Sequence, residues 1–105
     1  MDAGPTDSVE IYLEPDGVVV VGGEFDLAGI EIFEAVTEPL RDGPSDVSID
    51  LSRCTFIDST ALHAIVRFSR TSGDRDVVLL RPSAHVRRVM GLVGLDGREG
   101  IRIER

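Results

Sequence analysis

A short stretch with an acid, three hydroxyls and a cysteine, residues 54–62, carries the side chains best suited to chemistry. The apolar alternation of a strand ends at Leu51 and helical spacing begins near Ser59, so we expect a short loop between them. Asp58 and Ser59 then lie at a helix N-terminus, where unpaired backbone N–H groups and the positive end of the helix dipole gather. Such a position accepts a phosphate group readily.

The same two residues also have a purely structural explanation. Asp and Ser are favoured N-cap residues, which contribute about 1 kcal/mol to helix stability. One of the pair can cap the helix while its neighbour carries a phosphate, so the two interpretations are compatible. The residues alone do not distinguish the capping interpretation from the phosphate interpretation.

A second acidic residue, Asp26, follows the strand predicted over residues 18–21 and a pair of glycines. In a parallel sheet, the loops beyond the carboxyl ends of the strands lie along one edge. Asp26 and Asp58 both follow such ends, so we expect them to share a surface near Ser59. The alternative is that Asp26 only caps the next helix.

Cys54, His63 and His85 do not form a set suited to catalysis or metal binding. A Cys–His enzyme needs a base within hydrogen-bond reach of the thiol, and the two histidines fall in different predicted helices. The single cysteine is expected to be buried, and the spacing is not that of a zinc site. We therefore predict no enzyme activity, no cofactor and no metal; an enzyme built on the Asp58, Ser59 and Cys54 loop is the least favoured alternative.

Strands and helices that alternate along the chain must position these residues. An alternating segment, a Pro15-Asp16-Gly17 turn and a valine run predict an N-terminal antiparallel hairpin. Apolar residues at every second position, or in a continuous run, predict the other strands. Apolar residues spaced three to four positions apart predict the helices. The strands are expected over residues 9–13, 18–21, 47–51, 77–80 and 101–103, and the helices over about 27–41, 59–72 and 83–93.

The expected element order is β-β-α-β-α-β-α-β. Helices between successive strands imply right-handed crossovers, and hence an α/β fold with a mixed, mostly parallel sheet. The apolar face predicted for the first helix is Ile32, Phe33, Val36 and Leu40, and Pro39 is expected to end its last turn. We predict one domain over residues 9–105 after a flexible N-terminus at 1–8.

The composition limits the class of partner. The chain has 105 residues and a net charge of −8, so nucleic acid and anionic membranes would repel it and a protein partner is expected. No apolar run approaches the roughly 20 residues that span a bilayer. With no signal peptide and one cysteine, the chain is expected in the reducing cytoplasm.

Three blocks of this sequence resemble the STAS domain, and the closest branch resembles the bacterial anti-sigma-factor antagonists. The resemblance covers about residues 18–103, and the middle block is the most specific. The blocks are Gly23-Glu24-Phe25-Asp26, Phe56-Ile57-Asp58-Ser59-Thr60-Ala61-Leu62, and Pro82-Ser83-Ala84-His85-Val86-Arg87-Arg88-Val89-Met90 with Gly94-Leu95.

The resemblance implies a phosphorylation switch. Carried over from the family, Ser59 is the phosphorylated residue and Thr60 is a weaker candidate, while Asp26, Asp58, Thr60 and Ala61 belong to the partner-binding surface. The unphosphorylated domain would bind an anti-sigma factor that is often a serine kinase, and the phosphate would release it. The alternative function is an interaction subunit of a lipid-transport or signalling assembly that is not phosphorylated.

This chain departs from the family at two places. The family often has glycine where this chain has Ala61, and many relatives carry a further C-terminal helix where this chain ends soon after its fifth predicted strand. Alanine is the better helix former, so we expect a stiffer start to the helix.

Overall fold

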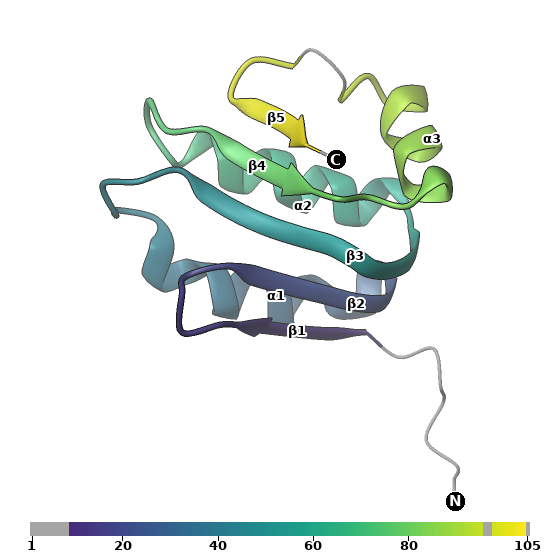
Figure 1. Ribbon diagram of the computed structural model, residues 1–105, viewed down its shortest axis with the longest axis horizontal. Helices are drawn as coiled ribbons and strands as arrows, with labels where there is room; N and C mark the ends of the chain where they lie inside the picture. The colour runs from purple at the N-terminus through teal and green to yellow at the C-terminus, as the bar shows by residue number, and fades with distance from the viewer. Residues whose placement is uncertain (1–8, 96–97, 105) are drawn as a thin grey trace, which may run out of the picture.

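The computed structural model describes residues 9–95 and 98–104, so the prediction of a flexible segment at 1–8 lies outside the described residues. The described residues form one sheet of five strands in the order β1-β2-β3-β4-β5 (Figure 1). The strands are β1 (Glu10–Leu13), β2 (Val19–Phe25), β3 (Val47–Ile57), β4 (Val77–Leu80) and β5 (Ile101–Glu104). Only the β1–β2 pair is antiparallel, which confirms the predicted mixed, mostly parallel sheet with an N-terminal hairpin.

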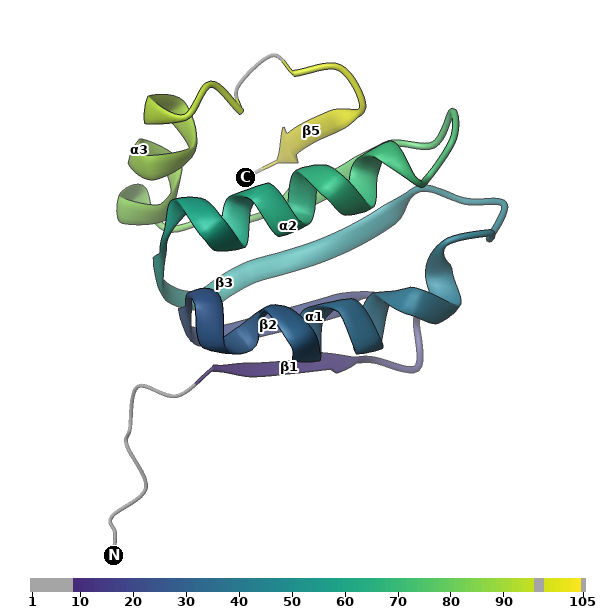
Figure 2. The same cartoon turned by 180° about the vertical axis from the view of Figure 1, so that it is seen from behind.

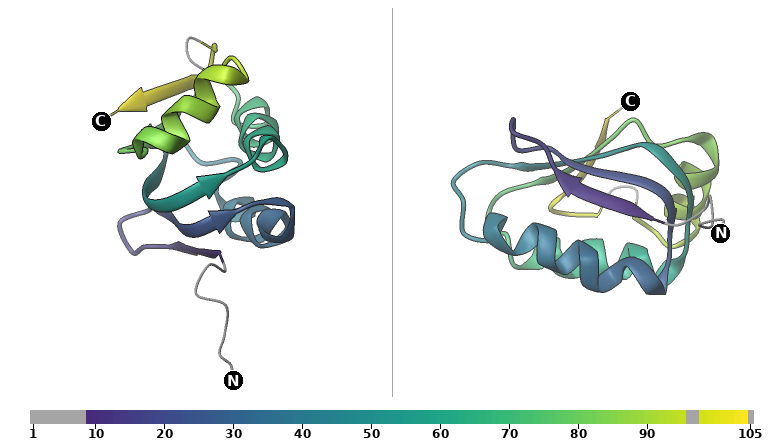
Figure 3. Two further views of the ribbon diagram at one scale, coloured as in Figure 1. Left: turned by 90° about the vertical axis from the view of Figure 1, so that its right-hand side faces the viewer. Right: turned by 90° about the horizontal axis from the view of Figure 1, so that it is seen from below.

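The helices lie where the sequence predicts them, although their bounds differ. They are the 3-10 helix η1 (Leu27–Gly29), α1 (Ile30–Thr37), the 3-10 helix η2 (Glu38–Leu40), α2 (Ser59–Arg70) and α3 (Ala84–Leu92). Helices α1 and α2 lie side by side over one face of the sheet (Figures 2 and 3). Helix α3 lies at the end of the sheet where β4 stops (Figure 1).

A cluster of three aromatic rings lies in the core beneath α1 and α2. Phe25, Phe33 and Phe68 are buried, and their ring centroids are 5.4 Å apart for the first pair and 6.2 Å for the second. Tilted and edge-to-face pairs of this kind add about 0.5–1.5 kcal/mol beyond the burial of area. Aliphatic side chains of the strands and of α2 surround this small aromatic centre and complete the core.

The first helix is shorter than predicted, and its buried face is rotated. The α-helix ends at Thr37, and η2 continues it with Pro39 in its first turn. Phe33 and Thr37 are buried, whereas Ile32, predicted in the apolar face, is 43% exposed. The physical reason is that one aromatic ring packing against two others buries more area than the isoleucine, and it therefore sets the rotation of the helix.

Strand β3 is longer than predicted. The period-two alternation stops at Leu51, but pairing with β2 continues to Ile57 through two register shifts. These irregularities change which side chains face the core, so Cys54 and Ile57 are buried although they do not continue the alternation. Gly22 and Gly23, which follow the strand predicted over residues 18–21, lie within β2, where Gly23 adopts a φ of 79° beside one of the shifts. Residues 54–57 are therefore strand and not loop.

An ion pair holds the carboxyl end of β4 to β3. Arg81 follows β4 with a left-handed φ of 51°, and its Nη2 lies 2.6 Å from Oδ2 of Asp50. The backbone N–H of Ser52 donates to Oδ1 of the same carboxylate at 2.9 Å. Burial acts to raise the pKa of Asp50, but the hydrogen bonds from Ser52 and Arg81 outweigh it, so the pKa lies below its ordinary value.

Replacing this carboxylate should make stability depend less on pH. Because the folded pKa of Asp50 is depressed, its contribution is present above the unfolded pKa of about 3.9 and is lost as the pH falls through the folded pKa. We expect Asp50→Asn to lower the free energy of unfolding by about 1 kcal/mol at neutral pH, since the Arg81 side chain is more than half exposed. Urea unfolding of both proteins from pH 7 towards pH 3 should show the difference shrinking; a constant difference would contradict this role.

Candidate functional site

The carboxyl ends of β2 and β3 bring the two predicted aspartates to one edge of the sheet. Phe25 and Ile57 are register partners, and Asp26 and Asp58 follow them directly. The backbone N–H of Asp58 donates to the carbonyl oxygen of Phe25 at 3.2 Å, which extends the strand pairing by one bond. Neighbouring strands lie about 4.8 Å apart, so both carboxylates start from adjacent positions on this edge.

Asp58 is the N-cap of α2. Its Oδ1 accepts a hydrogen bond from the backbone N–H of Ala61 at 2.9 Å and another from the Thr60 hydroxyl at 2.7 Å. The capping interpretation of Asp58 is therefore confirmed. The Thr60 hydroxyl is exposed but engaged with this carboxylate.

Ser59 is the first residue of α2 and is exposed. Within the described part of the chain, no hydrogen bond engages its hydroxyl. The oxygen therefore lies open to solvent at a helix N-terminus, next to a carboxylate that already satisfies a backbone donor of the first turn.

The other two predicted contact residues have different environments. Asp26 is half-buried and caps η1, because its Oδ1 accepts from the backbone N–H of Ala28 at 3.1 Å. Ala61 is fully buried, so the prediction that its side chain belongs to the partner-binding surface is corrected. The reason is helical geometry: with Ser59 and Thr60 facing solvent, the next position of the helix turns into the core.

Two apolar side chains that the residue patterns did not single out also lie at this edge. Leu27, directly after Asp26, is 70% exposed, and Phe56 at the end of β3 is 38% exposed. The Phe56 ring stacks on His85 of α3, with centroids 5.7 Å apart. An exposed aromatic residue one position from the end of a strand is the signal that could have found this contact. Phe56 falls in the loop predicted between Leu51 and Ser59, so no strand end was predicted beside it.

The enzyme alternative finds no support in the geometry around Cys54. The residue is buried, and its Sγ donates to the carbonyl oxygen of Phe56 at 3.2 Å. Burial raises the pKa of the Cys54 thiol, which disfavours the reactive thiolate. Among residues 9–95 and 98–104, no group of three acidic, histidine or cysteine side chains is placed to hold a metal ion.

The Asp58 cap is expected to contribute measurably to the stability of the fold. Asp58→Ala removes the acceptor of both the Ala61 N–H and the Thr60 hydroxyl, and we expect the free energy of unfolding to fall by about 1 kcal/mol, within a range of roughly 0.5–2 kcal/mol. Asp58→Asn keeps a capping oxygen and is the matched control, with an expected loss of only a few tenths. Equal unfolding midpoints in urea for wild type and Asp58→Ala would contradict the capping role.

A family model described as "Mlab, STAS domain" matches residues 13–103. The chain belongs to the STAS domain family. The family resemblance expected from the three sequence blocks is thereby confirmed, and the match runs from the last residue of β1 into β5.

Curated relatives of this STAS domain are named as anti-sigma-B factor antagonists. The anti-sigma-B factor antagonist of Staphylococcus aureus is 30% identical over 93 residues, covering 82% of this chain and 86% of the relative. The anti-sigma-B factor antagonist of Staphylococcus epidermidis matches to the same extent. Within the described residues, no helix is both long and apolar enough to cross a membrane.

Solved structures confirm the fold. A Thermotoga maritima protein assigned as an anti-sigma factor antagonist superposes with a TM-score of 0.72 at 24% identity, covering 92% of this chain and 86% of that one. The unphosphorylated form of the anti-sigma factor antagonist SpoIIAA superposes with a TM-score of 0.66 at 19% identity, covering 91% and 87%. The SpoIIAA of Bacillus in its phosphorylated form gives a TM-score of 0.61 at 20% identity, covering 91% and 90%.

Proposed function

We propose that this STAS domain is an anti-sigma factor antagonist that binds an anti-sigma factor with serine kinase activity and is released when Ser59 is phosphorylated. The observation that carries the proposal is the exposed Ser59 hydroxyl at the start of α2, on an edge shared with Asp26 and Asp58. The curated relatives, named as anti-sigma-B factor antagonists, support the class of partner.

The edge around Ser59 has the mixture of groups that a protein partner needs. Leu27 and Phe56 offer exposed apolar surface beside the two carboxylates and the hydroxyl. Apolar contacts at the centre of an interface provide most of its affinity, and polar groups around them provide specificity. In this proposal the domain acts by binding and performs no reaction of its own.

The proposal is tested by identifying the partner and the modification together. The purified domain is used to capture proteins from a lysate of the bacterium that encodes it, and the captured protein is incubated with the domain and ATP. We expect a kinase-like anti-sigma factor, and a phosphate that mass spectrometry places on Ser59. Modification confined to Thr60, or capture of a sigma factor itself, would overturn this assignment of roles.

A second candidate function is an interaction subunit that is not phosphorylated, in a lipid-transport or signalling assembly. The description of the matching family model, which names Mlab, favours this class. The fold would be the same, but Ser59 would serve only as a surface residue. A captured partner without kinase activity, together with an unmodified Ser59 in growing and stressed cells, would favour this candidate over the first.

A further inference from the structure

A pocket of about 290 Å³ lies between α2 and the segment that follows α3. Its floor is apolar and consists of Leu62, Val66 and Leu95, which are all buried, while Val93 adds an apolar rim. A hydrocarbon group entering the pocket would displace water from apolar surface, a gain of about 0.8 kcal/mol for each buried CH₂.

The polar groups around this floor are all basic. Arg67 and Arg70 of α2, Arg98 from the opposite side and His63 line the pocket, and no acidic residue does so among the described residues. In a chain with a net charge of −8, such a local excess of positive charge is unusual. Neither Arg70 nor Arg98 forms an ion pair with a carboxylate in the described part of the chain.

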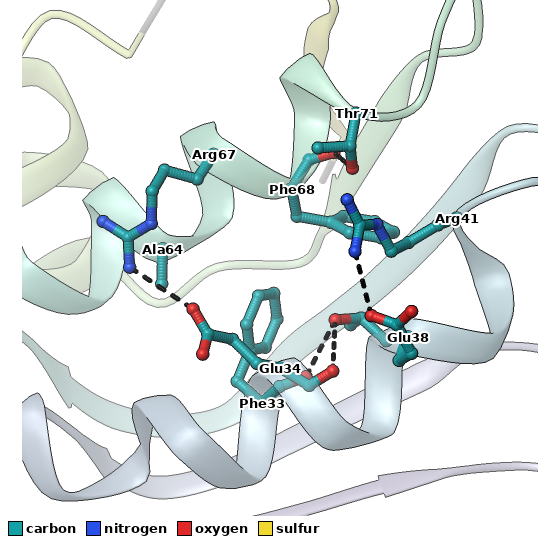
Figure 4. A pocket seen from close by; sticks show the side chains of 9 residues that line it. Phe33, Glu34, Glu38, Arg41, Ala64, Arg67, Phe68 and Thr71 are labelled. Atoms are coloured by element: carbon teal, nitrogen blue, oxygen red, sulfur yellow. Dashed lines mark hydrogen bonds and ion pairs between the residues drawn. The ribbon is translucent and has the colours of Figure 1, made fainter.

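In the cleft on the other side of α2, acidic side chains accompany the arginines. This cleft lies between α1 and α2, has a volume of about 340 Å³ and is shown in Figure 4. There Arg67 pairs with Glu34 at 3.6 Å and Arg41 pairs with Glu38 at 3.0 Å, so acidic residues of the cleft itself balance its arginines.

A third cavity, of about 450 Å³, also contains acidic side chains. Arg70 and Arg98 border it, but so do Asp74, Asp76 and Glu99. Of these three cavities, the one between α2 and the segment after α3 alone combines a buried apolar floor with a lining in which the described residues include no carboxylate.

We propose that this basic pocket binds a single-chain amphiphile with an anionic head, such as a medium-chain carboxylate. The planar guanidinium groups of Arg70 and Arg98 suit a carboxylate, which accepts two parallel hydrogen bonds from one arginine. The volume lies at the lower end of the range for small-molecule sites, which favours one short chain over a two-chain lipid. This inference does not depend on the proposed function, because none of its residues is Ser59, Asp26 or Asp58.

The probe for a first test is octanoate, with 1-octanol as the uncharged compound of equal chain length. Isothermal titration calorimetry gives the affinities, and amide chemical shifts in two-dimensional NMR spectra locate the site. We expect octanoate to bind at least about tenfold more tightly than octanol, because a hydrogen bond to a charged group contributes roughly 1.5–3 kcal/mol. The shifts should centre on Leu62, Val66 and Arg98.

Paired variants separate this pocket from general electrostatics. The double variant Arg70→Gln/Arg98→Gln should weaken octanoate binding about tenfold or more. The control Arg87→Gln/Arg88→Gln removes the same charge from exposed positions of α3 outside the pocket and should leave the affinity within about twofold. Circular dichroism checks that both variants are folded.

Several results would overturn the proposal. Equal binding of octanoate and octanol would remove the role of the arginines, and shifts centred elsewhere would remove the site. A short peptide of one leucine flanked by aspartates tests the alternative of a protein partner. If it shifts these amides more strongly than octanoate at equal concentration, the pocket is a docking site for a partner protein instead. These results leave the phosphorylation of Ser59 untouched, so failure here and failure of the proposed function are distinguishable.

Discussion

Replacing Ser59 by Asp is expected to weaken binding to the anti-sigma factor tenfold or more while the domain keeps its fold. The substitution places a permanent negative charge at the first residue of α2, beside the carboxylate of Asp58. A phosphate would add about −1.5 to −2 charges at the same place. Measuring the affinity of wild type and Ser59→Asp for the purified partner checks this prediction.

Repulsion between like charges outweighs the attraction of the new charge to the helix N-terminus. A favourable interaction of the new charge with the helix N-terminus contributes only about 0.3–1 kcal/mol at an exposed site. Repulsion opposes this gain. Two like charges about 5 Å apart, such as the new charge and a neighbouring carboxylate, repel by roughly 1 kcal/mol in water and by about 3 kcal/mol at an effective dielectric constant of 20, which applies once a partner excludes water. A net cost above 1.4 kcal/mol corresponds to a tenfold loss of affinity.

Ser59→Asn is the matched control for this experiment, because asparagine has nearly the shape of aspartate without its charge. We expect it to retain most of the affinity. If Ser59→Asn weakens binding as much as Ser59→Asp, the effect is steric and the charge mechanism is wrong. If neither variant weakens binding, the partner does not dock near the start of α2.

The largest effect on stability is expected from Phe33→Ala. Phe33 is fully buried between Phe25 and Phe68, and its ring also lies in the floor of the cleft between α1 and α2 (Figure 4). Truncating a buried phenylalanine to alanine costs about 3–5 kcal/mol through lost transfer free energy and the cavity that remains. Small domains have a total stability of about 5–15 kcal/mol, so this variant should lose at least about a fifth of it.

The neighbouring Ile32 is the control, because it tests the rotation of α1 directly. Ile32 is 43% exposed, so Ile32→Ala should lower the free energy of unfolding by less than about 1 kcal/mol. Urea unfolding monitored by circular dichroism gives both values. Equal losses for the two variants would mean that α1 packs with the isoleucine inward, as the residue pattern alone predicts.

Local patterns in the sequence predict the fold well where one element decides its own structure. The turn at residues 15–17 joins β1 to β2, and Asp58 caps α2, as their residue types indicate. Ser83 caps α3 in the same way, accepting a hydrogen bond from the backbone N–H of Val86 at 3.2 Å. These features depend on hydrogen bonds over two to four residues, so the residue type is sufficient to predict them.

The candidate site was predictable in part for the same reason. The order of strands and helices places Asp26 and Asp58 after neighbouring parallel strands, and that order follows from alternating apolar patterns. The exposure of Ser59 follows from its position at the start of an amphipathic helix. The pairing of Phe56 with His85 was not predictable, because it joins β3 to α3 through a strand that runs past its regular alternation.

By itself, the sequence determined the order of the elements, the caps and the serine at the start of α2, since each depends on residues that are neighbours along the chain. Only the tertiary structure decided the rest. The rotation of α1 about Phe33, the continuation of β3 to Ile57, the burial of Ala61 and the meeting of Arg81 with Asp50 all depend on surfaces far apart in sequence. Long-range packing chooses among local arrangements of nearly equal free energy, and no local pattern records that choice.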